Sequence, residues 1–371
     1  MNLLRRTLYE KLRLIQNAHC MSTGATTHVA QSLQIEQLRE RALIRIVGDE
    51  IRPFLQGLVT NDIEHLQRNS SAVYAMFLNK GGRMLCDSII YRSQHENTFF
   101  LECDVKSVDD LVRHLKLFRV RRKIAVDSVN ADYSVYVVHG GLKNAEVNEA
   151  VFPKKTAEPS VDKDIVLCQD PRLKYLGTRV VVPNKYSPHT IQKFFPDNEL
   201  LPADPGNDYV SLRYKLGVGE GVGDHPPLKA FPIESNGDYL HGISFHKGCY
   251  LGQELTARTY HTGVIRKRLM PITISDPSTA SDRESDIKTS KGATVGKLRG
   301  QKNGFGLALM RIEKIADSGS LTLNGSVCTV SRPFWWPGAL PKTKAEAATA
   351  ETQTPNVNQP LKSEGVTSAL Y

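Results

Sequence analysis

The chain has 371 residues, of which 40% are hydrophobic and 23% are charged, and its formal net charge is +9. These values fit a globular protein with a real core, divided into two or three domains at roughly 100–200 residues each. No window approaches the roughly 18 apolar residues of a membrane span, and so modest a charge gives no reason to infer nucleic-acid binding.

Residues 1–30 are predicted to be a mitochondrial transit peptide. They contain Arg5, Arg6, Lys11 and Arg13 against one acidic residue, Glu10. Large apolar residues recur at helical spacing opposite the arginines, and a stretch rich in Ser, Thr and Gly follows. The alternative is an ordinary amphipathic surface helix. The transit peptide predicts that the protein acts in the mitochondrial matrix.

Residues 31–260 alternate strands and helices with antiparallel hairpins, which is typical of an α+β fold. We expect strands at 41–47, 98–103, 121–129 and 179–183, and a hairpin over 73–92 that turns at 79–82. Helices are expected at 51–58, at 107–118 with a Ser107–Asp110 capping box, at 208–217, and in a short segment capped by Asn61. Residues 142–165 are expected to form a surface loop.

Residues 217–240 are rich in Gly, Pro and Asn and are expected to be irregular. Within them GVGEGVG, residues 217–223, lacks the spacing of a phosphate-binding loop, and it is interpreted as a flexible loop. Short strands broken by Gly, Asn and Ser turns fill residues 261–338 and predict a small β-barrel or sandwich, closed by Trp335 and Trp336. Residues 339–371 have almost no large apolar side chains and are expected to be a disordered tail.

The six cysteines are scattered, without CxxC pairs or Cys/His clusters, so a disulfide framework, a structural zinc site and a self-contained Cys₄ site are poorly supported. Cys249 differs from the rest because it lies in KGCYLGQE, between Lys247 and two glycines. The residues after Gly252 favour a helix, whose N-terminal N–H groups, with the lysine charge, favour a thiolate. A small buried core cysteine is the alternative.

The segment KGCYLGQELTAR resembles the signature of the YgfZ-type iron–sulfur assembly proteins, which are relatives of the glycine-cleavage T protein (GcvT), a folate-dependent aminomethyltransferase. Residues 54–63, 77–91 and 213–236 resemble further blocks of this family in the same order. The positions that match the signature are Lys247, Gly248, Cys249, Tyr250, Gly252, Gln253 and Glu254. Asp62 and Glu234 match polar positions of the flanking blocks.

The resemblance implies a GcvT/YgfZ-like, multi-lobed α+β body around a central folate-sized cavity, followed by a C-terminal antiparallel β-barrel. It implies tetrahydrofolate as a cofactor, with Asp62, Asp87 and Glu234 as candidate binding residues. The T protein has acidic residues just after its Gly-Gly turn. One alignment places Cys86 at the acidic position and removes the candidate general base, whereas another register places Asp87 there.

Three functions follow. The first is an assembly factor for mitochondrial [4Fe–4S] proteins such as aconitase and lipoate synthase of the radical-SAM type. It would act with A-type iron–sulfur carriers, as a monomer or a heterocomplex, and Cys249 would be a ligand of a transient cluster shared with the carrier. The alternative is a tetrahydrofolate-dependent one-carbon transferase. The third, a redox protein using Cys249 as a sulfenate-forming thiol, lacks a resolving cysteine nearby in the sequence.

Overall fold

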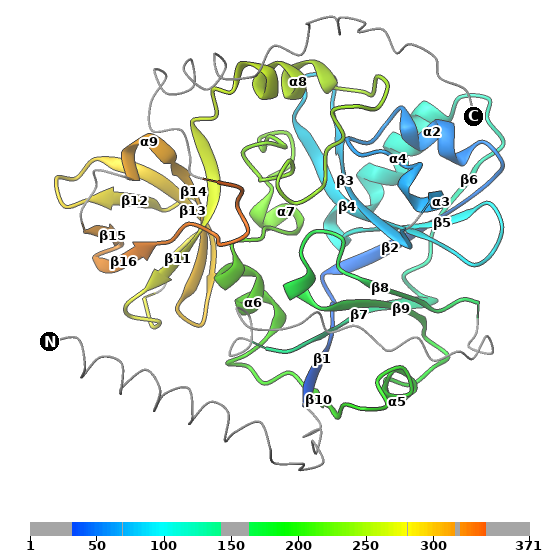
Figure 1. Ribbon diagram of the computed structural model, residues 1–371, viewed down its shortest axis with the longest axis horizontal. Helices are drawn as coiled ribbons and strands as arrows, with labels where there is room; N and C mark the ends of the chain where they lie inside the picture. Colours follow the sequence, from blue (N-terminus) through cyan, green and yellow to red (C-terminus); the bar gives the residue numbers. More distant parts are fainter. Residues whose placement is uncertain (1–31, 69, 142–162, 280, 316–319, 339–371) are drawn as a thin grey trace, which may run out of the picture.

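The computed structural model describes residues 32–68, 70–141, 163–279, 281–315 and 320–338, and in these ranges it has two five-stranded sheets and a closed six-stranded barrel (Figure 1). The predicted transit peptide, residues 142–162 of the predicted surface loop, and the predicted tail lie outside the described residues. None of the described helices is both long and apolar enough to cross a bilayer.

The first sheet is antiparallel, with strand order β3-β4-β5-β2-β6. Its strands are β2 (Arg41–Val47), β3 (Ala72–Leu78), β4 (Met84–Arg92), β5 (Thr98–Asp104) and β6 (Ala125–Ser128). Two helices, α2 (Ile51–Gln56) and α4 (Val108–Arg119), cover one face and bury their apolar side chains there. These elements confirm the hairpin, the two helices and the strands that periodicity predicted, although the strand expected at 121–129 covers only Ala125–Ser128.

Two predicted helix caps are wrong. Helix α3 is only His65–Arg68, and the Asn61 amide instead donates to the carbonyl oxygens of Tyr74 and His241 at 2.8 and 2.7 Å. At α4 the Ser107 hydroxyl caps nothing, because a 3₁₀ turn, Val105–Ser107, precedes the helix and already places Ser107 in helical backbone conformation. The Asp104 carboxylate caps that turn by accepting from the Lys106 amide at 2.8 Å.

The second sheet packs against the other face of the first and has strand order β10-β1-β7-β9-β8, with β1 and β10 parallel. Its strands are β1 (Leu33–Gln37), β7 (Tyr133–His139), β8 (Val166–Gln169), β9 (Thr178–Pro183) and β10 (Leu200–Pro202). A short helix, α5 (His189–Gln192), and a 3₁₀ turn, Lys174–Leu176, complete this body. The sequence had predicted only β9 of this sheet.

Two helices lie between the sheets and the barrel, α6 (Tyr209–Leu216) and α7 (Gly221–Asp224) (Figure 1). The barrel, in the order β11-β14-β13-β12-β15-β16, confirms the predicted β domain. Its elements are β11 (Lys267–Ile274), β12 (Asp286–Thr289), β13 (Thr294–Lys302), β14 (Phe305–Arg311), α9 (Ile312–Ile315), β15 (Leu321–Leu323) and β16 (Ser326–Val330). Trp336 is buried in the barrel core, and the Trp335 indole donates to the Leu216 carbonyl at 2.8 Å.

Candidate functional site

The signature loop, residues 247–252, is held against the chain segment that follows α2. The Leu251 amide donates to the Gly57 carbonyl at 3.0 Å, and just before the loop the Ser244 amide donates to the Thr60 carbonyl, also at 3.0 Å. The Thr60 hydroxyl donates to the Gly242 carbonyl at 2.6 Å. These bonds join parts of the chain that are almost 200 residues apart, so the loop is fixed by tertiary structure rather than by its own turn chemistry.

Lys247 contributes to this attachment with its side chain. Its amine donates to the carbonyl oxygens of Val59 at 2.9 Å and Asn61 at 2.7 Å. Burial lowers the pKa of Lys247 to about 8, against the opposing effect of the Asp62 carboxylate. Lys247 was predicted to act as a positive charge near the Cys249 thiol. Its amine also holds the signature loop to residues 59–61.

The second half of the loop leads into helix α8 (Gln253–Thr262), whose first residue holds the loop by a side-chain hydrogen bond. The Gln253 side-chain oxygen accepts from the Tyr250 amide at 3.1 Å. The Tyr250 ring is buried in the core between the two sheets, and burial raises the pKa of its hydroxyl to about 12. A buried ring and a side-chain hydrogen bond thus fix the backbone on either side of Leu251.

Gly252 is required by a close approach to the β3–β4 hairpin turn. Its φ of +79° lies in the left-handed region, and a Cβ there would lie 2.4 Å from the Asn79 carbonyl oxygen. Gly82 of the turn also has positive φ, and a Cβ on it would lie 3.0 Å from the Gly252 carbonyl oxygen. The structure therefore packs two sequence blocks of the resemblance, the Gly-Gly turn and the signature loop, directly against each other.

Cys249 is exposed at the outer side of this loop, whereas the other cysteines in the described ranges are buried. It lies in the turn that precedes α8, three residues before the Gly252 cap, rather than in the helix itself. Gly248 has open space around it, and exposed Glu254 pairs with Arg258 on the surface of α8. The loop therefore presents the sulfur on a fixed backbone whose attachment depends on its neighbours and not on the thiol.

Cys86 and Asp87 point to opposite faces of the first sheet, as neighbours on a strand do. Cys86 is buried in the helix-covered core, where burial raises the pKa of its thiol well above the usual value. Asp87 lies on the face toward the second sheet, where one carboxylate oxygen accepts from the Gly221 amide at 2.9 Å. The acidic side chain after the Gly-Gly turn that faces the junction of the sheets is therefore Asp87.

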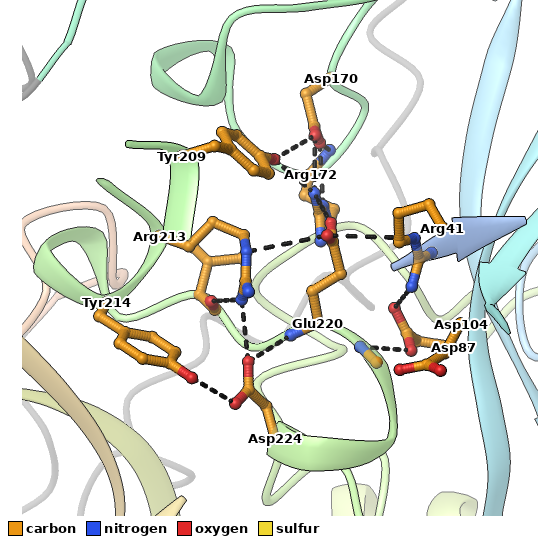
Figure 2. A network of polar contacts seen from close by, with 12 residues as sticks. Arg41, Asp87, Asp104, Asp170, Arg172, Tyr209, Arg213, Tyr214, Glu220 and Asp224 are labelled. Atoms are coloured by element: carbon orange, nitrogen blue, oxygen red, sulfur yellow. Dashed lines mark hydrogen bonds and ion pairs between the residues drawn. The ribbon is translucent and has the colours of Figure 1, made fainter. Parts of the chain in front are cut away.

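A buried network of ion pairs fills that junction and has Glu220 at its centre (Figure 2). Four guanidinium groups surround the carboxylate: Arg172 at 2.7 Å, Arg213 at 3.7 Å, Arg41 at 3.9 Å, and Arg179 in direct contact. Burial alone would raise the pKa of Glu220, but the four positive charges outweigh it and hold the pKa well below its ordinary value.

The network continues through further buried acids from both sheets and α7. Asp170 forms a two-pronged pair with Arg172, at 2.9 and 2.7 Å, and Glu102 accepts from Arg41 at 2.7 Å. Asp224 accepts from Arg213 at 2.8 Å. Glu220 belongs to the GVGEGVG segment, so the prediction of a flexible loop there is wrong: its glutamate is the buried centre of the molecule's charge network.

The three acids predicted to bind folate have separate sets of partners. The Asp62 carboxylate accepts from the side-chain amide of Gln56 at 2.8 Å and from the backbone amide of Glu64 at 3.0 Å. Burial raises the pKa of Asp62, but these bonds outweigh it and lower the pKa. Glu234 lines a cavity of about 210 Å³ beside α8, and burial raises its pKa. Asp87 lies in the junction. Among the described residues, no hydrogen bond or ion pair joins any two of the three.

Comparison with known proteins places the chain in a family. The mitochondrial iron–sulfur cluster assembly factor IBA57 of Mus musculus is 37% identical over 322 residues, which cover 82% of this chain and 85% of that protein. The protein of the same name from Homo sapiens is 37% identical, with 81% and 85% covered. This chain belongs to the IBA57 family. Membership confirms the predicted resemblance, the mitochondrial location and the role in iron–sulfur cluster assembly.

Two further likenesses concern the fold. A family model described as the C-terminal β-barrel domain of CAF17 matches residues 266–338. The glycine cleavage system aminomethyltransferase T of Bartonella henselae superposes with a TM-score of 0.60 at 14% identity, covering 83% of this chain and 88% of that one. These findings confirm the GcvT-like α+β fold with a C-terminal barrel. In the part of the chain that is described, no group of three or more His, Cys, Asp or Glu side chains is arranged to hold a metal ion.

Proposed function

We propose that this IBA57-family chain matures mitochondrial [4Fe–4S] proteins, aconitase and lipoate synthase among them, in a heterocomplex with an A-type iron–sulfur carrier. In that complex Cys249 supplies one thiolate to a cluster whose remaining ligands come from the carrier. The observation that carries the proposal is the exposed Cys249 sulfur on a loop fixed by Lys247, Tyr250 and Gly252. The cluster is cargo, and one thiolate is one ligand of the several that such clusters take.

The test replaces Cys249 with serine in the full chain and mixes it with a cluster-loaded A-type carrier. The wild-type chain is expected to form a complex whose visible absorption and circular dichroism report a bound cluster, and Cys249→Ser is expected to lose that signal. Because the loop is attached through other residues, the thermal unfolding midpoint should not change. In cells the variant should lose aconitase activity while a [2Fe–2S] enzyme stays active. An unchanged spectrum and unchanged aconitase activity would refute the role of the thiol.

We propose tetrahydrofolate as a second ligand, with one-carbon transfer as the alternative function. The supporting observation is a set of buried polar atoms at the junction, Arg41 Nη2, Tyr74 Oη and Asp87 Oδ2, that have no hydrogen-bond partner among the described residues. A carboxylate acceptor beside guanidinium and hydroxyl donors fits the amino and oxo edge of a pterin. Bound folate would supply the carrier atom for a one-carbon unit, and these three side chains would orient its ring.

Calorimetric titration of the chain with tetrahydrofolate tests this second proposal. Wild-type protein is expected to bind, and Asp87→Asn is expected to bind at least tenfold more weakly, because the amide replaces one acceptor oxygen of the carboxylate with an NH2 donor and removes its negative charge. A melting curve of the variant verifies that it is folded. Absence of heat with the wild-type chain would rule out folate binding and leave the assembly function untouched.

A further inference from the structure

A surface beside the signature loop combines exposed positive charge with a strained, outward-facing leucine. Three segments form it: the hairpin turn 79–84, residues 226–231, and the signature loop 247–252. The turn contacts the loop through Gly82 and Gly252, and the Leu228 amide donates to the Met84 carbonyl at 2.8 Å. The three segments are therefore one continuous surface, although 173 positions separate the first from the last.

This surface is positive. Its segments, NKGGRM, PPLKAF and KGCYLG, contain the exposed Lys80, Arg83 and Lys229 and no acidic residue. Their fourth basic residue, Lys247, adds no exposed charge, because its amine donates to the carbonyl oxygens of Val59 and Asn61. Arg83 is held rigidly, because its guanidinium lies 4.5 Å from the centroid of the Phe231 ring and donates to the Lys229 carbonyl at 3.1 Å. A pre-ordered guanidinium at the surface is suited to a carboxylate of another molecule, because little freedom is lost on binding.

Leu228 stands out among these residues because two unfavourable features coincide there. Its side chain is 52% exposed, and its φ of +60° lies in the left-handed region, which an L-residue with a side chain adopts only at an energetic cost. The backbone bonds to β4 on both sides, Leu228 to Met84 and Met84 to Ala230 at 3.0 Å, hold it in that conformation. Neither burial of its side chain nor backbone preference explains a leucine at this position.

We propose that this surface docks the iron–sulfur carrier, with Leu228 inserting into an apolar socket on an acidic face of that partner. The inference rests on the proposed function and adds where and by what chemistry the carrier is recognised. Positive charge with no acid in three touching segments calls for a negative partner, and an apolar anchor inside a charged rim is the usual arrangement of a binding hot spot. Docking here places the carrier's thiolates next to Cys249, on the loop that Gly82 contacts.

Leu228→Gly separates recognition from folding. Glycine adopts the left-handed conformation without strain, so the thermal unfolding midpoint should stay the same or rise. Affinity for the cluster-loaded A-type carrier, measured by calorimetry with the full chain, should fall at least tenfold. The matched control is Leu117→Ala, at a leucine 70% exposed on α4, which should bind like the wild type.

Charge reversal tests the electrostatic part of the proposed docking. Lys80→Glu with Lys229→Glu should slow association at low salt by at least tenfold, and the effect should fade as salt rises. The control, Lys288→Glu with Lys291→Glu, changes the net charge by the same amount but on the barrel, and it should have little effect on the association rate.

If the wild-type chain does not bind the carrier, the proposed function fails. If it binds and Leu228→Gly binds equally well, only the docking surface is refuted. A self-association of the wild-type chain that Leu228→Gly abolishes would assign the surface to a second copy instead.

Discussion

The residues around Cys249 divide into those that fix the backbone and those that face outward. Four residues each make a specific contact that holds the loop: the Lys247 amine, the buried Tyr250 ring, the close approach at Gly252 and the side-chain hydrogen bond of Gln253. The remaining residues of the signature are accessible. The pattern of the signature therefore reflects two demands at once, a rigid frame and an accessible sulfur.

The two glycines of the loop allow this division to be tested at single residues. Gly252→Ala forces a Cβ to 2.4 Å from the Asn79 carbonyl oxygen at a φ of +79°, so we expect a loss of about 1–3 kcal/mol in the free energy of unfolding and faster alkylation of Cys249. Gly248→Ala is the matched control, because nothing lies within 4 Å of its Cβ and its φ is not positive. Urea unfolding and thiol labelling measure both. Equal effects of the two substitutions would contradict the proposed division.

At the scale of elements, the sequence predicted what is built from local contacts. The β3–β4 hairpin, α4 and the barrel strands follow directly from alternation, helical spacing and turn residues, because these patterns are complete within each element and its adjoining turns. The second sheet was missed since β1 joins remote parts of the chain: Ile35 pairs with Val138 of β7, and Leu33 pairs with Leu200 of β10. The sequence of β1, LQIEQ, is mostly polar and does not predict a strand by itself.

The same distinction separates the predicted from the missed parts of the site. Cys249 was found because glycines and charge around a cysteine are visible in eight consecutive residues. The place of Glu220 was missed because its partners come from positions as distant as Arg41, and a Gly-rich segment looks flexible until those partners are known. The structural use of Lys247 was hidden for the same reason, since its acceptors lie at Val59 and Asn61.

At the scale of the whole molecule, the buried charge network joins parts that otherwise meet through apolar packing. Arg41 and Glu102 come from the first sheet, Arg179 from the second, and Arg213 from α6, which also contacts the barrel. Buried ion pairs add little net stability over apolar packing, but removing one partner leaves the others uncompensated. The network therefore specifies how the two sheets, α6 and the barrel are placed relative to one another more than it adds to the free energy of unfolding.

The substitution Glu220→Gln tests this role of the buried network. The substitution keeps the shape but removes the negative charge that four arginines share, so we expect the free energy of unfolding at neutral pH to fall by about 3–5 kcal/mol. Because the folded pKa of Glu220 is depressed, its contribution is complete above the ordinary value of 4.5 and is lost as the pH falls toward the folded value. The difference in the free energy of unfolding between wild type and variant should therefore narrow in acid, as urea unfolding across that pH range would show.

Glu254→Gln is the control. It breaks only the exposed pair with Arg258 and should change the free energy of unfolding by less than about 0.5 kcal/mol at every pH. A gap for Glu220→Gln as small as that of the control would mean that the four arginines are satisfied without the carboxylate, and that packing alone sets how the sheets and the barrel meet.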